Sequence, residues 1–311
     1  LVPDSVTNSV LLGVGGSSNQ CIAVGSHGTV LWATNVFLWN AVPQRPTTND
    51  LQGVCFTGER FILCGGNGTL LTSTVGTTNW NLRATPTTAF LMSVEAWPGG
   101  VVAVGEDGVI LTSTNGIAWA QQPSGTTNWL SQVRYRDGRL IAVGENGTIL
   151  TSSDATNWVS RNSGTTAWLN AVDFLEDTWF IAGNQGTFLG SPDATNWFNL
   201  GTATKKSLYG LTIANGQLIT VGLEGVILRS QLVPDPTPIA IAEFAHLSGM
   251  NLFLFTGAPD QQFVLESSPD LDAWTDGPWL EFLDGTGTLI LLETTTADAG
   301  PAQYYRTRRE R

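Results

Sequence analysis

The stretch that decides the fold is residues 130–158, which read LSQVRYRDGRLIAVGENGTILTSSDATNW. Short runs of alternating apolar and polar residues lie on both sides of Asn146-Gly147, a pair that supplies the positive φ angles of a primed hairpin turn. We expect four short strands here, at residues 129–135, 139–143 and 148–152 and around Trp158. Because strand follows strand without a helix, the unit is predicted to be an antiparallel sheet.

The same unit recurs six times along the chain. A Gly-x-x-Gly step marks each copy, and its first glycine is at Gly25, Gly65, Gly105, Gly144, Gly183 and Gly222, with successive spacings of 40, 40, 39, 39 and 39 residues. A leucine precedes each of these anchor glycines by 14 residues, at Leu11, Leu51, Leu91, Leu130, Leu169 and Leu208. A four-stranded unit repeated about every 40 residues is typical of a β-propeller blade. We therefore predict an all-β fold, with a β-propeller over residues 1–231 in which six blades are visible and seven are possible.

The sixth copy departs from the pattern at its end. After Arg229 the chain runs into the proline-rich residues 232–238, and the tryptophan strand found in the other copies is missing. The segment Leu1 to Asn8 could supply this strand and latch the ring, because circular stacking requires the two ends of a propeller to meet. A seventh blade would need residues from elsewhere, for example from the C-terminal region.

Composition excludes several classes of function. A net charge of −12 with only two lysines argues against a nucleic-acid partner, which requires basic surface. No apolar run approaches the 18 residues of a membrane span. Leu1 does not begin a signal peptide, and a start other than Met leaves open that a leader was removed.

Cysteine and histidine spacing predicts no metal site and no cofactor. Cys21, Cys55 and Cys64 lack metal-ligand spacing, and the two histidines are far apart. In the hairpin that contains two of these cysteines, Cys55 is expected opposite Ile62 rather than opposite Cys64, which disfavours a disulfide. We expect buried free thiols.

Two heptapeptides carry a resemblance to a known family. Ser152-Ser153-Asp154-Ala155-Thr156-Asn157-Trp158 and Ser191-Pro192-Asp193-Ala194-Thr195-Asn196-Trp197 resemble Asp-box motifs. A Ser-Gly-Thr-Thr-x-Trp-Leu segment ends on the leading leucine at residues 124–130 and 163–169. Together they resemble, over residues 9–231, the bacterial-neuraminidase-repeat propellers of the photosystem II stability/assembly-factor-like family. That family includes assembly factors and many secreted bacterial proteins without known chemistry.

The resemblance implies a structural role for the Asp-box residues: the aspartate bonds backbone amides and the tryptophan packs between strands. The residues concerned are Ser152, Asp154, Trp158, Ser191, Asp193 and Trp197. The copies that begin at Ser73 and Ser113 lack the aspartate. Sialidases share the Asp-box, but this chain has no comparable arginine triad, so sialidase activity is rejected and no catalytic residue is assigned.

One face of the propeller is the candidate binding site. Because strand direction alternates, the loops from strand 4 to strand 1 and the turns from strand 2 to strand 3 emerge together. The loops carry Phe90, Trp129 and Trp168, and the turns carry His27, Asn67, Glu106, Asp107, Glu145, Asn184, Gln185 and Glu224. Aromatic rings beside amides and carboxylates suit a protein anchor or a sugar, although blade packing is a competing explanation of the aromatic residues.

Residues 239–311 are predicted to form a second domain, a β-sandwich, after the linker 232–238. Apolar and polar residues alternate over Ile239–Ala245, Asn251–Phe255, Gln262–Glu266, Leu289–Leu292 and Tyr304–Thr307. The segment Phe263 to Trp274, together with Tyr304-Tyr305-Arg306, resembles C-terminal fibronectin-III-like modules of secreted Verrucomicrobia and Planctomycetes proteins. That resemblance implies an extracellular or cell-envelope location. Calcium could be attracted by Asp260, Asp270, Asp272 and Asp276, which lack the regular loop of an EF-hand.

A repeat architecture without a catalytic constellation predicts a non-catalytic, secreted or cell-envelope binding or scaffold protein. Its propeller face would engage a protein or a glycan, and the chain could be a subunit of a larger surface or assembly complex. The alternative is a polysaccharide-active enzyme, a glycoside hydrolase or lyase, that uses paired carboxylates on the face as acid and base.

Overall fold

The computed structural model describes residues 7–34, 38–202, 204–214, 216–230, 240–247, 250–256, 262–268, 275–281, 288–294 and 304–309. It divides into two compact units, Leu1–Ser230 and Gln231–Arg311, and each is described here by itself. The predicted linker at residues 232–238 lies outside the described residues. In the part of the chain that is described, no helix is long and apolar enough to cross a membrane.

The first three blades of unit 1 are four-stranded antiparallel sheets whose strands follow chain order. Blade 1 contains β1 (Leu11–Gly16), β2 (Cys21–Gly25), β3 (Thr29–Ala33) and β4 (Asn40–Ala41). Blade 2 contains β5 (Leu51–Phe56), β6 (Phe61–Gly65), β7 (Thr69–Ser73) and β8 (Asn81–Leu82). Blade 3 contains β9 (Leu91–Trp97), β10 (Gly100–Gly105), β11 (Ile110–Ser113) and β12 (Ala120–Gln122).

The last three blades repeat this arrangement, with one strand fewer among the described residues of the sixth. Blade 4 contains β13 (Leu130–Arg136), β14 (Arg139–Gly144), β15 (Ile149–Ser152) and β16 (Val159–Arg161). Blade 5 contains β17 (Leu169–Leu175), β18 (Thr178–Gly183), β19 (Phe188–Ser191) and β20 (Phe198–Asn199). Blade 6 contains β21 (Leu208–Ala214), β22 (Gln217–Gly222) and β23 (Ile227–Arg229). The predicted β-propeller with six blades is therefore confirmed.

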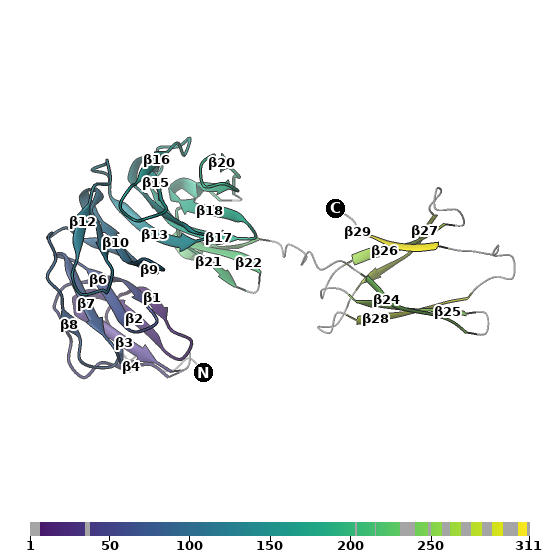
Figure 1. The fold of residues 1–311 in the computed structure, drawn as a ribbon, viewed down its shortest axis with the longest axis horizontal. Helices are drawn as coiled ribbons and strands as arrows, with labels where there is room; N and C mark the ends of the chain where they lie inside the picture. Colours follow the sequence, from purple (N-terminus) through teal and green to yellow (C-terminus); the bar gives the residue numbers. More distant parts are fainter. Residues whose placement is uncertain are drawn as a thin grey trace. The chain divides into compact units, whose positions relative to one another are not determined.

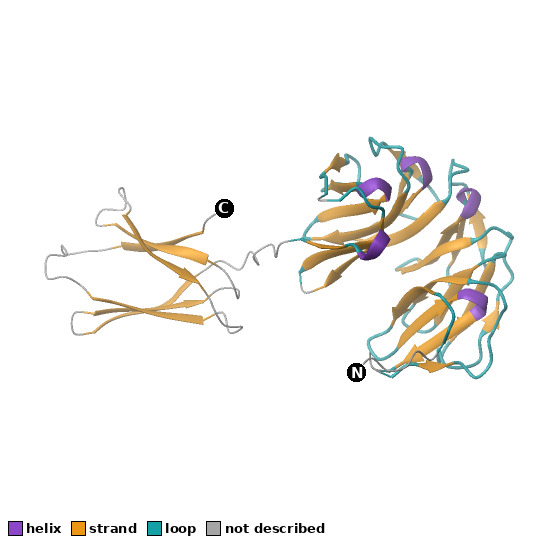
Figure 2. Cartoon of the chain, turned by 180° about the vertical axis from the view of Figure 1, so that it is seen from behind, coloured by secondary structure: helices purple, strands orange, loops and turns teal. Residues whose placement is uncertain are grey.

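Successive blades lie side by side along an arc (Figure 1). Their first strands pack on one another in the order β1, β5, β9, β13, β17, β21, so these are the inner strands of the propeller. Single-turn 3-10 segments, drawn in purple in Figure 2, join the second strand to the third in five blades. They are η1 (Ser26–Gly28), η2 (Glu106–Gly108), η3 (Glu145–Gly147), η4 (Asn184–Gly186) and η5 (Leu223–Gly225).

The primed turn expected at Asn146-Gly147 is confirmed. Both residues have positive φ, 53° and 66°, and the Thr148 N–H donates to the Glu145 carbonyl at 3.0 Å. Positive φ at both central residues is what a type I′ turn requires.

The anchor glycine is required because two backbone segments approach closely at that point. Gly144 is extended, with φ −176°, but a Cβ there would collide with the carbonyl oxygen of Trp129, the residue before the leading leucine. The Cβ atoms of the other anchors would meet the corresponding carbonyl oxygens of Val10, Asp50, Phe90, Trp168 and Ser207. The six-fold repetition of glycine therefore reflects a lack of space rather than a special φ angle.

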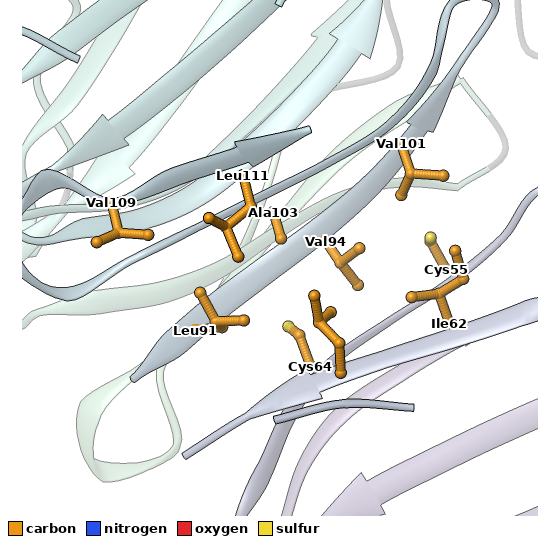
Figure 3. Packing of buried hydrophobic residues seen from close by; sticks show 10 residues of the cluster. Cys55, Ile62, Cys64, Leu91, Val94, Val101, Ala103, Val109 and Leu111 are labelled. Carbon is orange, nitrogen blue, oxygen red and sulfur yellow. The ribbon is translucent and has the colours of Figure 1, made fainter. Parts of the chain in front are cut away.

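The core of the propeller lies between neighbouring blades. Leu91 and Val94 of the inner strand β9 pack on Cys64 and Leu70 of the preceding blade, in the cluster shown in Figure 3. In that hairpin Cys55 is in register with Ile62, as predicted, and Cys64 with Gly53. Cys21, Cys55 and Cys64 are free, but only Cys55 and Cys64 are buried as expected, because Cys21 is half-buried. Burial raises the pKa of the Cys64 thiol to about 12, so this thiol stays protonated and unreactive.

The described residues of unit 2 form two three-stranded antiparallel sheets, ordered β24-β25-β28 and β27-β26-β29. Five of the six strands coincide with the predicted runs: β24 (Ala240–Leu247), β25 (Met250–Thr256), β26 (Gln262–Ser268), β28 (Thr288–Thr294) and β29 (Tyr304–Arg309). The sixth, β27 (Thr275–Glu281), was not predicted. Of the four carboxylates considered for calcium, Asp276 lies in β27, and Asp260, Asp270 and Asp272 lie outside the described residues. No cluster of His, Cys, Asp and Glu suited to a metal ion occurs within the described ranges.

The lack of space at the anchor glycine can be tested with two neighbouring residues. We expect Gly65→Ala to lower the free energy of unfolding by at least about 1–3 kcal/mol, because its Cβ would collide with the Asp50 carbonyl. Gly66→Ala is the matched control: its Cβ would meet the Phe90 ring at 3.4 Å, an ordinary contact. Urea denaturation followed by circular dichroism measures both. Equal losses for the two variants would contradict this explanation of the repeat.

Candidate functional site

The loops and turns predicted to share a face do so. The Gly68 N–H of a strand 2–3 turn donates to the Ala89 carbonyl of the following strand 4–1 loop at 3.0 Å. Gly147 and Ala167 make the same bond at 2.9 Å two blades further on. We call this side of the propeller the turn face.

One position on the turn face combines a fixed backbone with a variable side chain. The carbonyl before each leading leucine accepts the N–H of the first residue of the adjacent turn in all six blades, at 2.8–2.9 Å. The side chains at this position are Val10, Asp50, Phe90, Trp129, Trp168 and Ser207. Because this backbone hydrogen bond forms with Asp50 and Ser207 as well as with Trp129, the fold does not require an aromatic residue at this position.

Phe90, Trp129 and Trp168 occupy this position in three consecutive blades, and we call them the aromatic row. All three are half-buried, at the starts of the neighbouring inner strands β9, β13 and β17. The rings of Trp129 and Trp168 meet edge to face, with centroids 6.1 Å apart and an interplanar angle of 66°. Trp168 also donates from Nε1 to Ser131 Oγ at 2.5 Å. Three adjacent blades thus present partly exposed rings in fixed orientations.

The predicted polar residues next to the row support its backbone. Glu106 Oε2 accepts the Phe90 N–H at 3.0 Å, and Glu145 Oε2 accepts the Trp129 N–H at 3.3 Å. Asn184 Oδ1 accepts a bond from Asn170 at 2.9 Å. The structure therefore brings these residues together with the aromatic row.

The other predicted polar residues are the exposed second residues of their turns. His27, Asn67, Asp107 and Glu224 all have φ between 55° and 57° and project from separate blades. The Lys206 ammonium lies 2.6 Å from the Glu224 carboxylate and holds the pKa of that group below its usual range. Gln185 occupies the same slot in blade 5, with φ 58°. His27, Asn67 and Glu224 thus belong to turns of blades 1, 2 and 6, whereas the turns that contact the row through their backbone begin at Glu106, Glu145 and Asn184.

The strand 3–4 turns depend on a side-chain acceptor. Asp154 Oδ1 accepts the N–H groups of Asn157 and Thr156 at 2.8 and 2.9 Å, and Trp158 Nε1 donates to the Ala155 carbonyl at 2.9 Å. In the next blade, Asp193 accepts the N–H groups of Asn196 and Thr195, both at 2.8 Å. Hydrogen bonds from Asn157 and Asn196 respectively are the main reason that the pKa of each aspartate lies well below its usual range.

Ser152 and Ser191 begin these turns and bond to the aspartates at 3.1 and 3.0 Å. Trp197 is buried against blade 5, and its Nε1 has no hydrogen-bond partner. Blade 3 lacks the aspartate, yet Asn115 Oδ1 accepts the N–H groups of Ile117 and Ala118 at 2.8 and 3.2 Å. Sequence reasoning missed this amide, which fills the role of the carboxylate.

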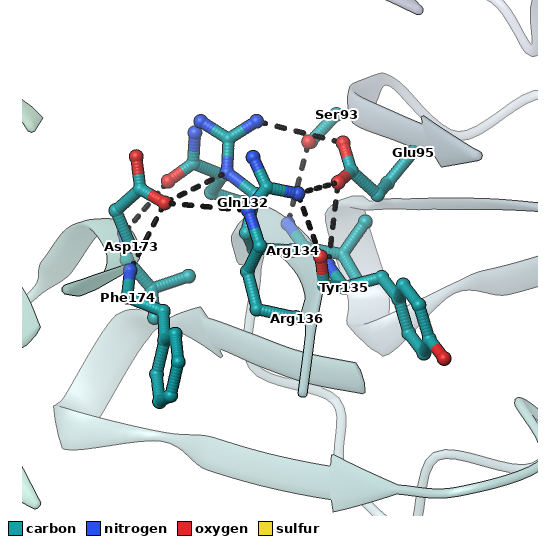
Figure 4. A network of polar contacts seen from close by, with 10 residues as sticks. Ser93, Glu95, Gln132, Arg134, Tyr135, Arg136, Asp173 and Phe174 are labelled. Carbon is teal, nitrogen blue, oxygen red and sulfur yellow. Dashed lines mark hydrogen bonds and ion pairs between the residues drawn. The ribbon is translucent and has the colours of Figure 1, made fainter. Parts of the chain in front are cut away.

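A charged network on the inner strands was also missed by the sequence analysis (Figure 4). Glu95 of β9 lies 3.5 Å from Arg134 Nη1 and 3.2 Å from Arg136 Nη1, both on β13. Asp173 of β17 lies 3.9 and 4.0 Å from Nε of the same two arginines. The carboxylate side chains are only 12% and 7% exposed. Two cations face two carboxylates, so the network is formally neutral and links three blades.

Side chains in the same network bond the backbone of the following blade. Ser93 Oγ accepts the Val133 N–H at 3.3 Å, and Gln132 Oε1 accepts the Val172 N–H at 2.7 Å. Glu95 Oε1 accepts the Tyr135 N–H at 3.3 Å. Burial nevertheless raises the pKa of Glu95, against the opposing effect of Arg134 and Arg136. The network holds inner strands together and includes one carboxylate whose ionisation is costly.

The free-energy cost of ionising buried Glu95 predicts how the stability of the protein depends on pH. Because the pKa of Glu95 is raised by folding, the folded protein binds that proton more tightly, and its stability falls as the pH rises through the pKa. Glu95→Gln does not ionise at this position, so it does not lose stability in this way. The free energy of unfolding of the variant minus that of the wild type should therefore increase from about pH 4 to about pH 7. Urea denaturation across this range measures the difference. A difference that stays constant with pH would contradict it.

Asp154→Asn is the control with the opposite sign. Because folding lowers the pKa of Asp154, its ionised carboxylate stabilises the fold at any pH above the usual pKa of an aspartate. This stabilisation is lost progressively as the pH falls below that usual pKa. The variant should be less stable than wild type at neutral pH, and the gap should narrow toward about pH 3.

Comparisons with known proteins bear on the fold. Residues 33–167 match the model of the DUF6242 beta propeller domain. No curated protein matches the chain. Among solved structures, YCF48 bound to D1 peptide is similar with a TM-score of 0.61 and 18% identity, over 94% of this chain and 95% of that chain.

Two further structures show the same likeness. YCF48 from Cyanidioschyzon merolae has a TM-score of 0.57 and 16% identity, over 71% of this chain and 82% of that chain. Virginiamycin B lyase from Staphylococcus aureus, in a catalytically inactive form with quinupristin, has a TM-score of 0.62 and 8% identity, over 81% of this chain and 93% of that chain. At these identities the similarity establishes that this chain contains a β-propeller.

Proposed function

We propose that this chain is a protein-binding propeller whose aromatic row takes an extended peptide segment of a protein partner. The observation that carries this proposal is the half-exposed set of Phe90, Trp129 and Trp168 in consecutive blades. The row stands at a position where the backbone is fixed and where Asp50 and Ser207 meet the needs of the fold equally well. Rigid, partly exposed aromatic residues are the typical anchors of protein interfaces.

The chemistry around the row supports a partner with apolar and basic side chains. Neighbouring blades repeat the same position, so the row offers successive apolar contacts to a chain that crosses several blades. Glu106, Asp107 and Glu145 add negative charge beside it. A peptide segment with apolar anchors and nearby basic side chains would be complementary to such a surface.

Two observations favour protein binding over the alternatives. Glu106 and Glu145, which acid–base chemistry on this face would use, already accept backbone hydrogen bonds from Phe90 and Trp129. A similar propeller, YCF48, has been solved bound to D1 peptide, which supports peptide binding as a use of this fold. Glycan binding and an extracellular location stay predictions of the sequence.

The proposal is tested with selected peptides. Random peptides of about 12 residues are displayed on phage, selected on the intact chain and measured by fluorescence anisotropy. We expect Trp129→Ala with Trp168→Ala to weaken binding at least about tenfold, because both anchors are removed. Phe198→Ala is the matched control, since Phe198 is an exposed aromatic residue of the outer strand β20.

Circular dichroism must first show that all variants keep the fold. Equal affinity for wild type and the double variant would place peptide binding elsewhere and overturn the proposed site. Binding on a glycan array that depends on both tryptophans, with no peptide selected, would replace the protein partner with a sugar.

A further inference from the structure

The propeller has a second face, on which the strand 1–2 turns and the strand 3–4 turns emerge together because strand direction alternates. We call it the hairpin face. One position on it stands where each strand 1–2 turn leads into the second strand, five residues before the anchor glycine. In the first five blades this position holds Gln20, Arg60, Gly100, Arg139 and Thr178.

The two arginines at this position reach the strand 3–4 turn of the following blade. The Arg139 guanidinium of blade 4 donates from Nη1 to the Asp193 carbonyl of blade 5. In blade 2, Arg60 Cδ lies 3.4 Å from the place that a Cβ on Gly116 of blade 3 would take. A long cationic side chain thus covers the space between neighbouring blades on the hairpin face.

Blade 3 has no side chain at this position. Gly100 has a φ of 136°, and a Cβ there would collide with the carbonyl oxygen of Ser113, so no other residue fits this backbone. The hairpin also differs at its other side, where Trp97 replaces the arginine that blade 4 has at Arg136. Blade 3 therefore lacks both arginines of the blade 4 hairpin and presents an indole ring instead.

A pocket of about 300 Å³ lies where the side chain is missing, between the hairpin of blade 3 and the strand 3–4 turn of blade 4. Its lining includes Trp97, Val101, Thr114, Ala118, Ala120 and Asp154. Trp97 is half-buried, and its ring packs on that of Tyr135 with centroids 6.1 Å apart, which fixes its orientation. The pocket thus has one rigid aromatic wall and one wall formed by a turn with a carboxylate.

Asp154 provides acceptors that a guanidinium could use. It is equivalent to Asp193, whose carbonyl Arg139 bonds, yet among the described residues the Asp154 carbonyl accepts no hydrogen bond. The pKa of the Asp154 carboxylate lies well below its usual range, so this group is negatively charged at neutral pH. A planar cation that donates several hydrogen bonds and stacks on an indole ring is complementary to these groups.

We propose that this pocket binds an arginine side chain of a partner protein, which supplies the guanidinium that blade 3 lacks. The guanidinium stacks on Trp97 and donates to the Asp154 carbonyl, and its aliphatic stem packs on Ala118 and Ala120. The net charge of −12 favours a cationic partner. The site is on the hairpin face and does not depend on the function proposed for the aromatic row.

An NMR titration tests the pocket directly. The isotope-labelled intact chain is titrated with N-acetyl-arginine amide, and the indole N–H of Trp97 is followed after assignment with Trp97→Phe. We expect a saturable shift of this signal. N-acetyl-lysine amide and the neutral isostere N-acetyl-citrulline amide should bind at least about tenfold more weakly, because one lacks the planar group and the other the charge.

Three outcomes of this titration would overturn the proposal. Absence of a saturable shift up to about 50 mM would mean that the pocket does not bind a guanidinium. Equal affinity for the lysine compound would reduce the effect to general attraction of cations. Tighter binding of free arginine than of its capped form would assign the pocket to the amino acid rather than to a partner protein.

A matched pair of variants isolates the charge of Asp154. Asp154→Asn should weaken binding of the arginine compound at least about threefold, because the anionic wall becomes neutral. Asn115 shows that an amide can support a turn of this kind. Asp193→Asn makes the same change outside the pocket and should leave the affinity unchanged. Equal effects of the two variants would attribute binding to net charge alone and contradict the site.

A second pair fills the pocket instead. Ala120 is exposed in β12 and lines the pocket, so Ala120→Trp should abolish the shift of the Trp97 signal. Val159 is the equivalent exposed residue of β16 and lies outside the lining, so Val159→Trp is the control. All variants must first give the dispersed spectrum of the folded chain. Unchanged affinity of Ala120→Trp would place arginine binding elsewhere.

Discussion

The structure depends on one close approach, between the anchor glycine of each blade and the carbonyl before the leading leucine. At Gly144 the carbonyl of Trp129 occupies the space of a Cβ and accepts the N–H of Glu145 at 2.9 Å. This contact fixes the start of the inner strand against the turn between strands 2 and 3. Because it involves only backbone atoms and one glycine, it leaves the side chain before the leucine free to vary. The fold thereby provides a variable position on a rigid frame.

The side chain of the leading leucine packs neighbouring blades against one another. Leu51, Leu91, Leu130, Leu169 and Leu208 are fully buried between neighbouring sheets. The positions that alternate with this apolar set on the inner strand need not be apolar, and there the chain places Glu95, Arg134 and Asp173. These charges satisfy one another and bond the backbone of the next blade, which removes much of the cost of burying them. Apolar and polar contacts thus hold the same three blades together.

The sequence predicted what repeats and missed what depends on three-dimensional proximity. The period, the anchor glycines and the primed turn follow from local chemistry, and the shared turn face follows from strand alternation. The Glu95–Arg134–Asp173 network joins residues 39 positions apart, which become neighbours only once the blades stack. Asn115 was missed because the motif specifies an aspartate, whereas an amide oxygen accepts the same backbone hydrogen bonds as a carboxylate. Strand β27 contains Gly277-Pro278, a pair that argues against a strand in any local pattern.

The aromatic row lies in blades 3, 4 and 5, whereas exposed apolar residues such as Leu11 and Val221 lie in blades 1 and 6. Phe90, Trp129 and Trp168 precede leucines that are fully buried, in blades with a neighbour on each side. The row is therefore preorganised by interfaces that are already complete, which lowers the entropy lost when a partner binds. The uncovered leucine, Leu11, belongs to blade 1, whose residue in the row position is Val10. The residues that position the row are therefore separate from the exposed apolar residues of blade 1.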